Sequence, residues 1–145
     1  MGNPKISHIF FYGTIRPGKH NYRWIETAVK RGDLTYAGQA TTVPDAFTMY
    51  VHCGVPYLVA RQPAAAVHTS VTGDVYRIAT KAGGATMRFI DDIEHRAGYA
   101  LETVDVKLQS GKVMEGVGIY VATESAAKDI QQIQGLDIVR SGDFN

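Results

Sequence analysis

The sequence predicts an α+β fold built around a small β-barrel. Many short segments have alternating or continuous apolar residues and are separated by turns that contain glycine or proline. Few segments space their apolar residues as an amphipathic helix does. Many short strands with few helices are typical of a small barrel with helices packed against it.

Length and composition predict one ordered domain, residues 1–145. The chain has 145 residues, of which 45% are hydrophobic and 20% charged, with a net charge of +1. We expect no nucleic-acid partner, because no basic run exceeds a pair. We expect no membrane association, because no apolar run approaches transmembrane length and the N-terminus lacks the apolar core of a signal peptide. We expect a cytoplasmic location, because the single cysteine cannot form an internal disulfide. Oligomeric state is left open.

The first half of the chain predicts one helix among several strands. The apolar run Ile9–Phe11 indicates the end of a buried strand, and a helix is expected from Asn21 to Arg31, with Gly32 ending it. The strands expected next are 34–42, 46–51, 57–60 and 71–78.

The second half predicts two helices around a hairpin. Apolar residues at Met87, Ile90 and Ile93 indicate a helix over 85–96, which Gly98 ends. Alternating apolar residues indicate a strand over 104–108. The Ser110-Gly111 turn joins it to a second strand, 113–121, in a hairpin. A short surface helix over 125–133 and an apolar tail over 138–144 that docks back on the domain complete the prediction.

The turn after the first strand is a candidate binding site. A buried strand that is interrupted at Gly13 leaves backbone N–H groups that need an acceptor, which a substrate carboxylate or carbonyl oxygen could supply. Gly13 to Lys19 also has the G-x-x-x-x-G-K spacing of a phosphate-binding loop. His20 replaces the required Ser or Thr, however, and Pro17 removes an N–H group, so a nucleotide is the weaker alternative.

The helix over 85–96 carries the second candidate site. Asp91, Glu94 and His95 share one face, and Glu94 borders the buried stripe of the helix. Partial burial there would raise the pKa of the Glu94 carboxyl and suit it to general acid/base catalysis. Helix periodicity alone favours the simpler alternative, a solvated acidic face with Asp92 and Arg96 as an i, i+4 ion pair.

The sequence contains no motif typical of a metal site or of an activated nucleophile. No Glu-x-x-His and no H-x-x-x-H spacing is present, so we expect no metal. Cys53, the single cysteine, has no internal disulfide partner and no neighbouring motif that would activate it, and we expect it to be buried or partly buried. Ser7 and Ser70 lack the sequence context of a nucleophile elbow.

Four segments in order carry the motifs of one known family. They are Tyr12-Gly13-Thr14-Ile15 for a Tyr-Gly-Thr-Leu signature, Val71-Thr72-Gly73-Asp74-Val75-Tyr76 for a Val-x-Gly-Glu-hydrophobic-Tyr strand, Phe89-Ile90-Asp91-Asp92-Ile93-Glu94 followed by Tyr99 for a Leu-Asp-x-hydrophobic-Glu…Tyr segment, and Gly118-Ile119-Tyr120-Val121 for a late strand. Order and spacing agree from about Ile6 to about Phe144. The chain therefore resembles the γ-glutamylcyclotransferase-like family, also called AIG2-like.

The resemblance implies a small mixed β-barrel with a few short flanking helices, no cofactor, and release of 5-oxoproline from a small-molecule γ-glutamyl substrate. It makes Glu94 the catalytic general acid/base. The substrate-binding residues that it implies are Tyr12, Gly13, Thr14, Ile15, Tyr99 and Tyr120.

Some positions depart from the family pattern. His95 stands where a glycine often follows the glutamate, and Ala100-Leu101-Glu102 lacks the basic residue common after the tyrosine. Thr14 followed directly by Ile15 resembles the branch that acts on γ-glutamylamines. The alternative function is a non-catalytic module that binds a small carboxylate or peptide end on the same scaffold.

Overall fold

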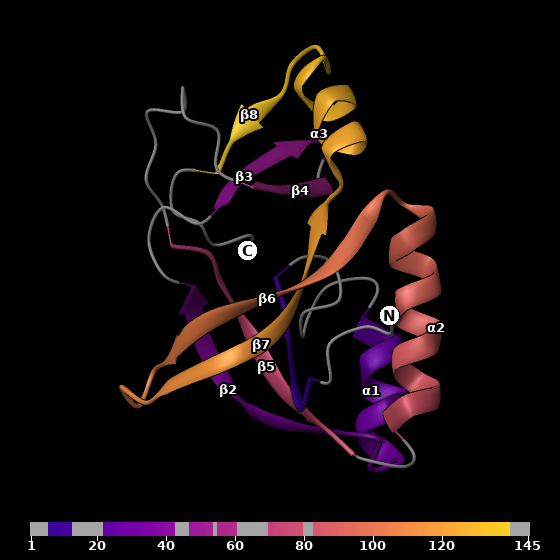
Figure 1. The fold of residues 1–145 in the computed structure, drawn as a ribbon, viewed down its shortest axis with the longest axis vertical. Coiled ribbons are helices and arrows are strands. Elements are labelled where there is room, and N and C mark those ends of the chain that lie inside the picture. The colour runs from indigo at the N-terminus through magenta and orange to yellow at the C-terminus, as the bar shows by residue number, and fades with distance from the viewer. Residues whose placement is uncertain are drawn as a thin grey trace.

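The computed structural model describes residues 6–12, 22–42, 47–53, 55–60, 70–79 and 83–139 (Figure 1). Its elements are β1 (His8–Phe11), α1 (Tyr22–Lys30), β2 (Leu34–Thr42), β3 (Phe47–His52), β4 (Val55–Ala60), β5 (Thr72–Ile78), α2 (Gly83–Arg96), β6 (Tyr99–Leu108), β7 (Val113–Ala122), α3 (Glu124–Gln131) and β8 (Asp137–Ile138). Strands β1-β5-β2-β6-β7 form a closed barrel, in which β1 and β7 pair in parallel and the other neighbours are antiparallel. This confirms the predicted α+β fold with a small mixed barrel.

Strand β1 is buried on both faces, which explains its continuous apolar run. Phe10 points into the barrel and packs with Val75 and Ile119. Ile9 and Phe11 point outward into a second cluster beneath the helices. Because both faces are covered, neither can be polar.

Close packing around β1 depends on a glycine of the neighbouring strand β5. A Cβ atom on Gly73 would lie 2.6 Å from Cζ of Phe10 and would also collide with the Phe11 carbonyl oxygen. Any larger residue would therefore push β5 away from β1. The glycine of the Val71–Tyr76 motif is thus required by packing.

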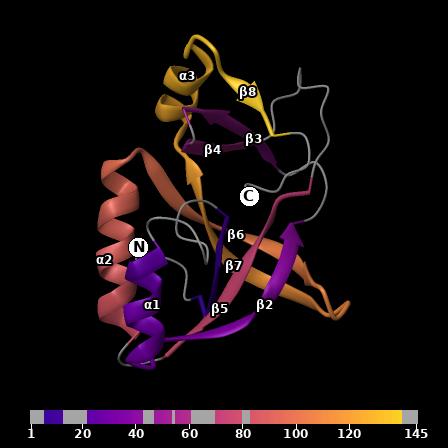
Figure 2. The ribbon, with the colours of Figure 1, turned by 180° about the vertical axis from the view of Figure 1, so that it is seen from behind.

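Helices α1 and α2 lie side by side on the outer face of the barrel (Figures 1 and 2). Ile25 and Ala28 of α1 and Ile90 of α2 belong to the same buried cluster as Ile9 and Phe11 of β1. The apolar face of each helix is thereby removed from water, which is the main source of stability for short helices.

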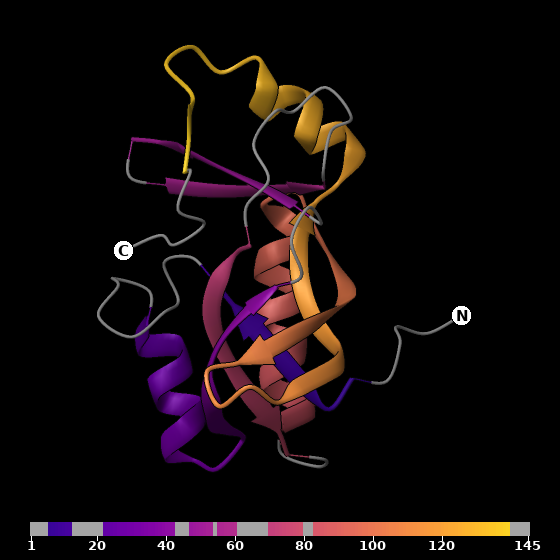
Figure 3. The ribbon, with the colours of Figure 1, turned by 90° about the vertical axis from the view of Figure 1, so that its left-hand side faces the viewer.

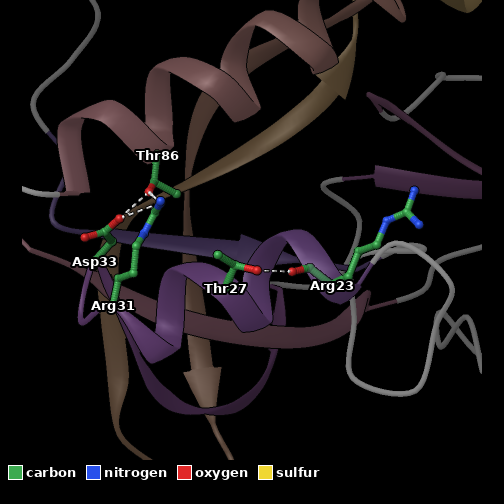
Figure 4. Close-up of polar contacts among 5 residues, drawn as sticks. All are labelled: Arg23, Thr27, Arg31, Asp33 and Thr86. Carbon is green, nitrogen blue, oxygen red and sulfur yellow. Dashed lines mark hydrogen bonds and ion pairs between the residues drawn. The ribbon is translucent and has the colours of Figure 1, made fainter.

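A polar cluster at one end of this helix pair holds α2 in place (Figure 4). The buried Asp33 carboxylate accepts a hydrogen bond from the Thr86 hydroxyl at 2.7 Å and pairs with the Arg31 guanidinium at 2.9 Å. Arg31 also donates to the Thr86 hydroxyl oxygen at 3.2 Å. We call Arg31, Asp33 and Thr86 the helix clamp. It joins the start of β2 to the first turn of α2, the helix that carries Glu94.

A three-stranded sheet, in the order β4-β3-β8, lies beyond one end of the barrel together with α3 (Figures 1 and 3). The sequence did not predict this separate sheet. Its strand β8 confirms that the tail docks back as far as Val139, whose N–H donates to the Met49 carbonyl at 2.8 Å. The rest of the predicted tail lies outside the described residues.

Most predicted bounds agree with the structure within two residues, but two predictions need correction. Strand β6 begins at Tyr99 rather than Val104, because Gly98 adopts φ +93°, ends α2 and lets Tyr99 pair at once with Ala122. Cys53 is exposed, not buried, because it occupies the tight turn between β3 and β4 with a left-handed φ of 51°. Among the described residues, no helix is long and apolar enough to cross a membrane.

Candidate active site

Glu94 lies in the last turns of α2, on the side that faces the barrel. Its side chain is partly buried, whereas Asp92 and Arg96 are exposed and form an ion pair at 2.9 Å. The two interpretations of the acidic helix therefore apply to different residues. Asp92 and Arg96 form the solvated i, i+4 pair, and Glu94 is the carboxyl that borders the core. His95 was expected on the face of Glu94 but is exposed.

Burial is the main reason that the Glu94 carboxyl differs from an ordinary one. Loss of solvent, and then the negative charge of Asp91, raise the pKa of Glu94 from 4.5 to about 7. Within the described part of the chain, no hydrogen bond or ion pair to its carboxylate offsets this effect. Glu94 can therefore gain or lose a proton near neutral pH, as a general acid/base must.

Three tyrosines from different strands lie in the electrostatic field of Glu94. They are Tyr12, directly after β1, Tyr99 at the start of β6, and Tyr120 in β7. Burial raises the pKa of each phenol, and the negative charge of Glu94 adds to the rise. The phenols therefore stay neutral beside the carboxyl.

Hydrogen bonds connect one of these tyrosines to α2 and another to β7. The Tyr120 hydroxyl donates to Oδ1 of Asp91 at 3.2 Å. The Tyr12 hydroxyl donates to the Tyr120 backbone carbonyl at 2.6 Å in a buried position. Strand β7 thus holds the end of β1 on one side and helix α2 on the other.

The structure brings together four of the predicted site residues, Glu94, Tyr12, Tyr99 and Tyr120. The other three, Gly13, Thr14 and Ile15, lie outside the described residues, as does the phosphate-loop spacing from Gly13 to Lys19. Asp91 was identified in the sequence only as a neighbour of Glu94 on the helix. Its contact with Tyr120 joins residues 29 positions apart, and the sequence carried no signal for that contact.

Two further features of the described residues bear on the chemistry. No group of three or more His, Cys, Asp or Glu side chains there could hold a metal ion. A hollow of about 520 Å³ lies between α1 and α2 and does not include Glu94. It is lined by Arg23, Thr27, Arg31, Ala85, Thr86, Phe89 and Ile90. These lining residues include no carboxyl, so we assign the chemistry to Glu94 and its tyrosines instead.

Comparison with known proteins agrees with this arrangement. The sequence model of the family described as gamma-glutamyl cyclotransferase, AIG2-like, matches residues 9–145. The chain therefore belongs to this family of cyclotransferases. No protein of curated function matches the chain by sequence.

Solved structures share the fold at low sequence identity. An uncharacterized protein from Pyrococcus horikoshii superposes with a TM-score of 0.60 at 21% identity, over 95% of this chain and 89% of the other. An AIG2-like protein from Mus musculus gives 0.60 at 21% identity, over 84% and 82% of the two chains. Protein ytfP from Escherichia coli gives 0.54 at 24% identity, over 94% of each. These likenesses establish the fold.

Proposed function

We propose that the protein is a cofactor-free γ-glutamylcyclotransferase that releases 5-oxoproline and a free amine from a γ-glutamyl amide. The observation that carries the proposal is the Glu94 carboxyl, whose pKa of about 7 arises from burial beside Asp91. Membership of the family supports a cyclotransferase-type reaction. The tyrosines around Glu94 place neutral phenols, rather than charged groups, beside the carboxyl.

The substrate brings its own nucleophile, the α-amine. Its nitrogen forms a bond to the γ-carbonyl carbon, and the bond from that carbon to the leaving nitrogen breaks. Glu94 accepts the proton that the attacking amine loses and returns it to the leaving nitrogen, so the enzyme is unchanged after each turnover. Such proton transfer is typically worth about 10²–10⁴-fold in rate, and holding the amine against the carbonyl adds a proximity effect.

Substrate recognition is assigned to the tyrosines and to the loop after β1. Tyr12, Tyr99 and Tyr120 are proposed to bind the γ-glutamyl group. The backbone N–H groups of Gly13, Thr14 and Ile15 are proposed to hold a substrate carboxylate or the oxyanion that develops on the carbonyl. The Thr14-Ile15 sequence supports a γ-glutamylamine as the substrate.

A substrate panel tests the proposal. The purified protein is incubated with several γ-glutamylamines and γ-glutamyl dipeptides, and 5-oxoproline is measured by mass spectrometry. We expect product from the wild type and from Glu115→Gln, which makes the same chemical change at an exposed position of β7, but not from Glu94→Gln. Ligand-induced thermal stabilisation without any product would overturn the proposal and favour a binding module.

A further inference from the structure

Asp91 is the charged group that shares the Glu94 site. The two residues are three positions apart on α2, so their side chains project from the same face one helical turn apart. Asp91 is partly buried, and its Oδ1 accepts the hydrogen bond from Tyr120. The adjacent Asp92 instead points to solvent, with 60% of its side chain exposed.

The hydrogen bond fixes Asp91 to the barrel. Tyr120 is only 3% exposed and lies in the cluster that joins β7 to the helices. A phenol held by packing on a strand is a rigid donor, so the carboxylate that it contacts has a defined place. Two carboxyl groups are therefore held one turn apart, and only one of them has a hydrogen-bond donor among the described residues.

We propose that Asp91 is a positioning residue of this site, whose carboxylate is fixed one turn before Glu94 by the Tyr120 hydroxyl and acts on Glu94 through its negative charge. The inference rests on the proposed function of Glu94 and deepens it. Asp91 touches no reacting atom in this scheme. Its charge makes Glu94 hold its proton more strongly and accept one more readily from the substrate amine.

The other groups that face Glu94 do not supply this charge. They are Tyr12 after β1, Tyr99 in β6 and Tyr120 in β7, with Tyr57 of β4 acting on Tyr99. Burial raises the pKa of the Tyr12, Tyr99 and Tyr120 phenols, so these three stay neutral when Glu94 titrates. Among the described groups, Asp91 is thus the one whose charge acts on Glu94, after burial itself.

The substitution Asp91→Asn separates charge from geometry. The Asn side chain keeps an Oδ1 that can accept from Tyr120, but it carries no charge. The matched control is Asp92→Asn, which removes the same charge from the next residue of the same helix, where the side chain is exposed. Tyr120→Phe is a second control, because it removes the donor and leaves the Asp91 charge in place.

The test is an NMR titration of the Glu94 carboxyl carbon in protein labelled with ¹³C-glutamate, assigned by the signal that is missing in Glu94→Gln. We expect a midpoint near 7 in the wild type. In Asp91→Asn the midpoint falls by about 0.5 to 2 pH units, the effect of one charge at this separation. In Asp92→Asn it stays within about 0.3 pH unit, because solvent and salt screen an exposed charge. In Tyr120→Phe, which keeps the Asp91 charge but frees its carboxylate, the midpoint falls by less than in Asp91→Asn.

Equal shifts in Asp91→Asn and Asp92→Asn, or no shift in either, would overturn the inference. If Asp91→Asn does not fold, Asp91→Ser is the second neutral variant, with the same expected fall. The titration needs no turnover, so a wild type that releases no 5-oxoproline would remove the proposed function and leave the charge coupling measurable. Where turnover is present, we expect Asp91→Asn to lower the plateau of kcat/KM about two- to tenfold, as a weaker base would.

Discussion

Asp33 and Glu94 are both acidic residues at the boundary between the helices and the barrel, and their surroundings differ. Asp33 is 5% exposed, and its carboxylate receives a hydroxyl and a guanidinium from the helix clamp. Glu94 is partly buried with no such partner among the described residues, and its neighbour Asp91 carries the same charge.

The comparison shows how partners determine what a buried carboxylate does. A carboxylate with a cation and a hydroxyl as partners joins two elements through charge-assisted hydrogen bonds. A carboxylate without them, next to a second negative charge, exchanges its proton near neutral pH. The first contributes to stability and the second costs stability, which is a common feature of catalytic groups.

The largest expected effect comes from neutralising Glu94. Glu94→Gln should lower the rate of 5-oxoproline release by about 10²–10⁴-fold, because the amide cannot accept the proton of the attacking amine. The variant should keep the wild-type fold, since the side chain has nearly the same size. Product rates and circular dichroism of the same samples check both statements. A loss of activity that accompanies unfolding would not support the catalytic role.

The opposite result is expected for Asp33. Asp33→Ala should lower the free energy of unfolding by about 2 to 3 kcal/mol, because it removes a charge-assisted partner of Arg31 and the acceptor of the Thr86 hydroxyl. Folded molecules should retain the turnover of the wild type. Urea denaturation and an assay well below the midpoint measure the two effects. A large loss of turnover in folded Asp33→Ala would mean that the two carboxylates are not independent.

Glu94→Gln should also stabilise the protein, and only at higher pH. Between about pH 4.5 and about pH 7 the folded protein binds more protons at Glu94 than the unfolded chain does, so stability falls as the pH rises through this window. Above this window Glu94 is ionised in the folded protein, and the full loss of stability is present. We expect Glu94→Gln to be more stable than the wild type by about 1 to 2 kcal/mol at pH 8 and no more stable at pH 4. Denaturation of both proteins at pH 4 and pH 8 measures this difference in the free energy of unfolding. An equal difference at the two pH values would contradict the raised pKa of Glu94.

The smallest effect is expected at the exposed pair. Asp92→Asn removes the ion pair with Arg96, whose side chain is 79% exposed, and should change stability by less than about 0.5 kcal/mol. Activity should be unchanged. Thermal melts of the variant and the wild type at low and high salt measure this change in stability. A change above the expected limit would show that Asp92 has a role beyond its solvated pair.

The local elements of the fold could be predicted because their signals are local. Alternation over 104–108, the glycine at Gly98 and the turn at Ser110-Gly111 each determine a few neighbouring residues. Closure of the barrel could not be predicted from such patterns, since β1 meets β7 in a parallel pair that joins Ile9 to Gly118. The small sheet was missed for the same reason, because β3 pairs with β8 across most of the chain.

The candidate site was predictable to the same degree. The position of Glu94 at the edge of the apolar stripe allowed a partly buried carboxyl with a raised pKa, which the structure has, although helix periodicity alone favoured a solvated acidic face. The resemblance to the family supplied the tyrosines. The Tyr120–Asp91 and Thr86–Asp33 contacts depend on how α2 packs on the barrel, and no spacing within α2 reveals them.

The most direct test of the catalytic role is the pH dependence of kcat/KM for 5-oxoproline release from a γ-glutamylamine, with the amine of the free substrate titrated separately. The proposed role predicts that the rate rises with pH through a midpoint near 7, reaches a plateau, and shows no such step in the residual activity of Glu94→Gln. A profile that the substrate amine explains completely, or the same step in Glu94→Gln, would contradict it.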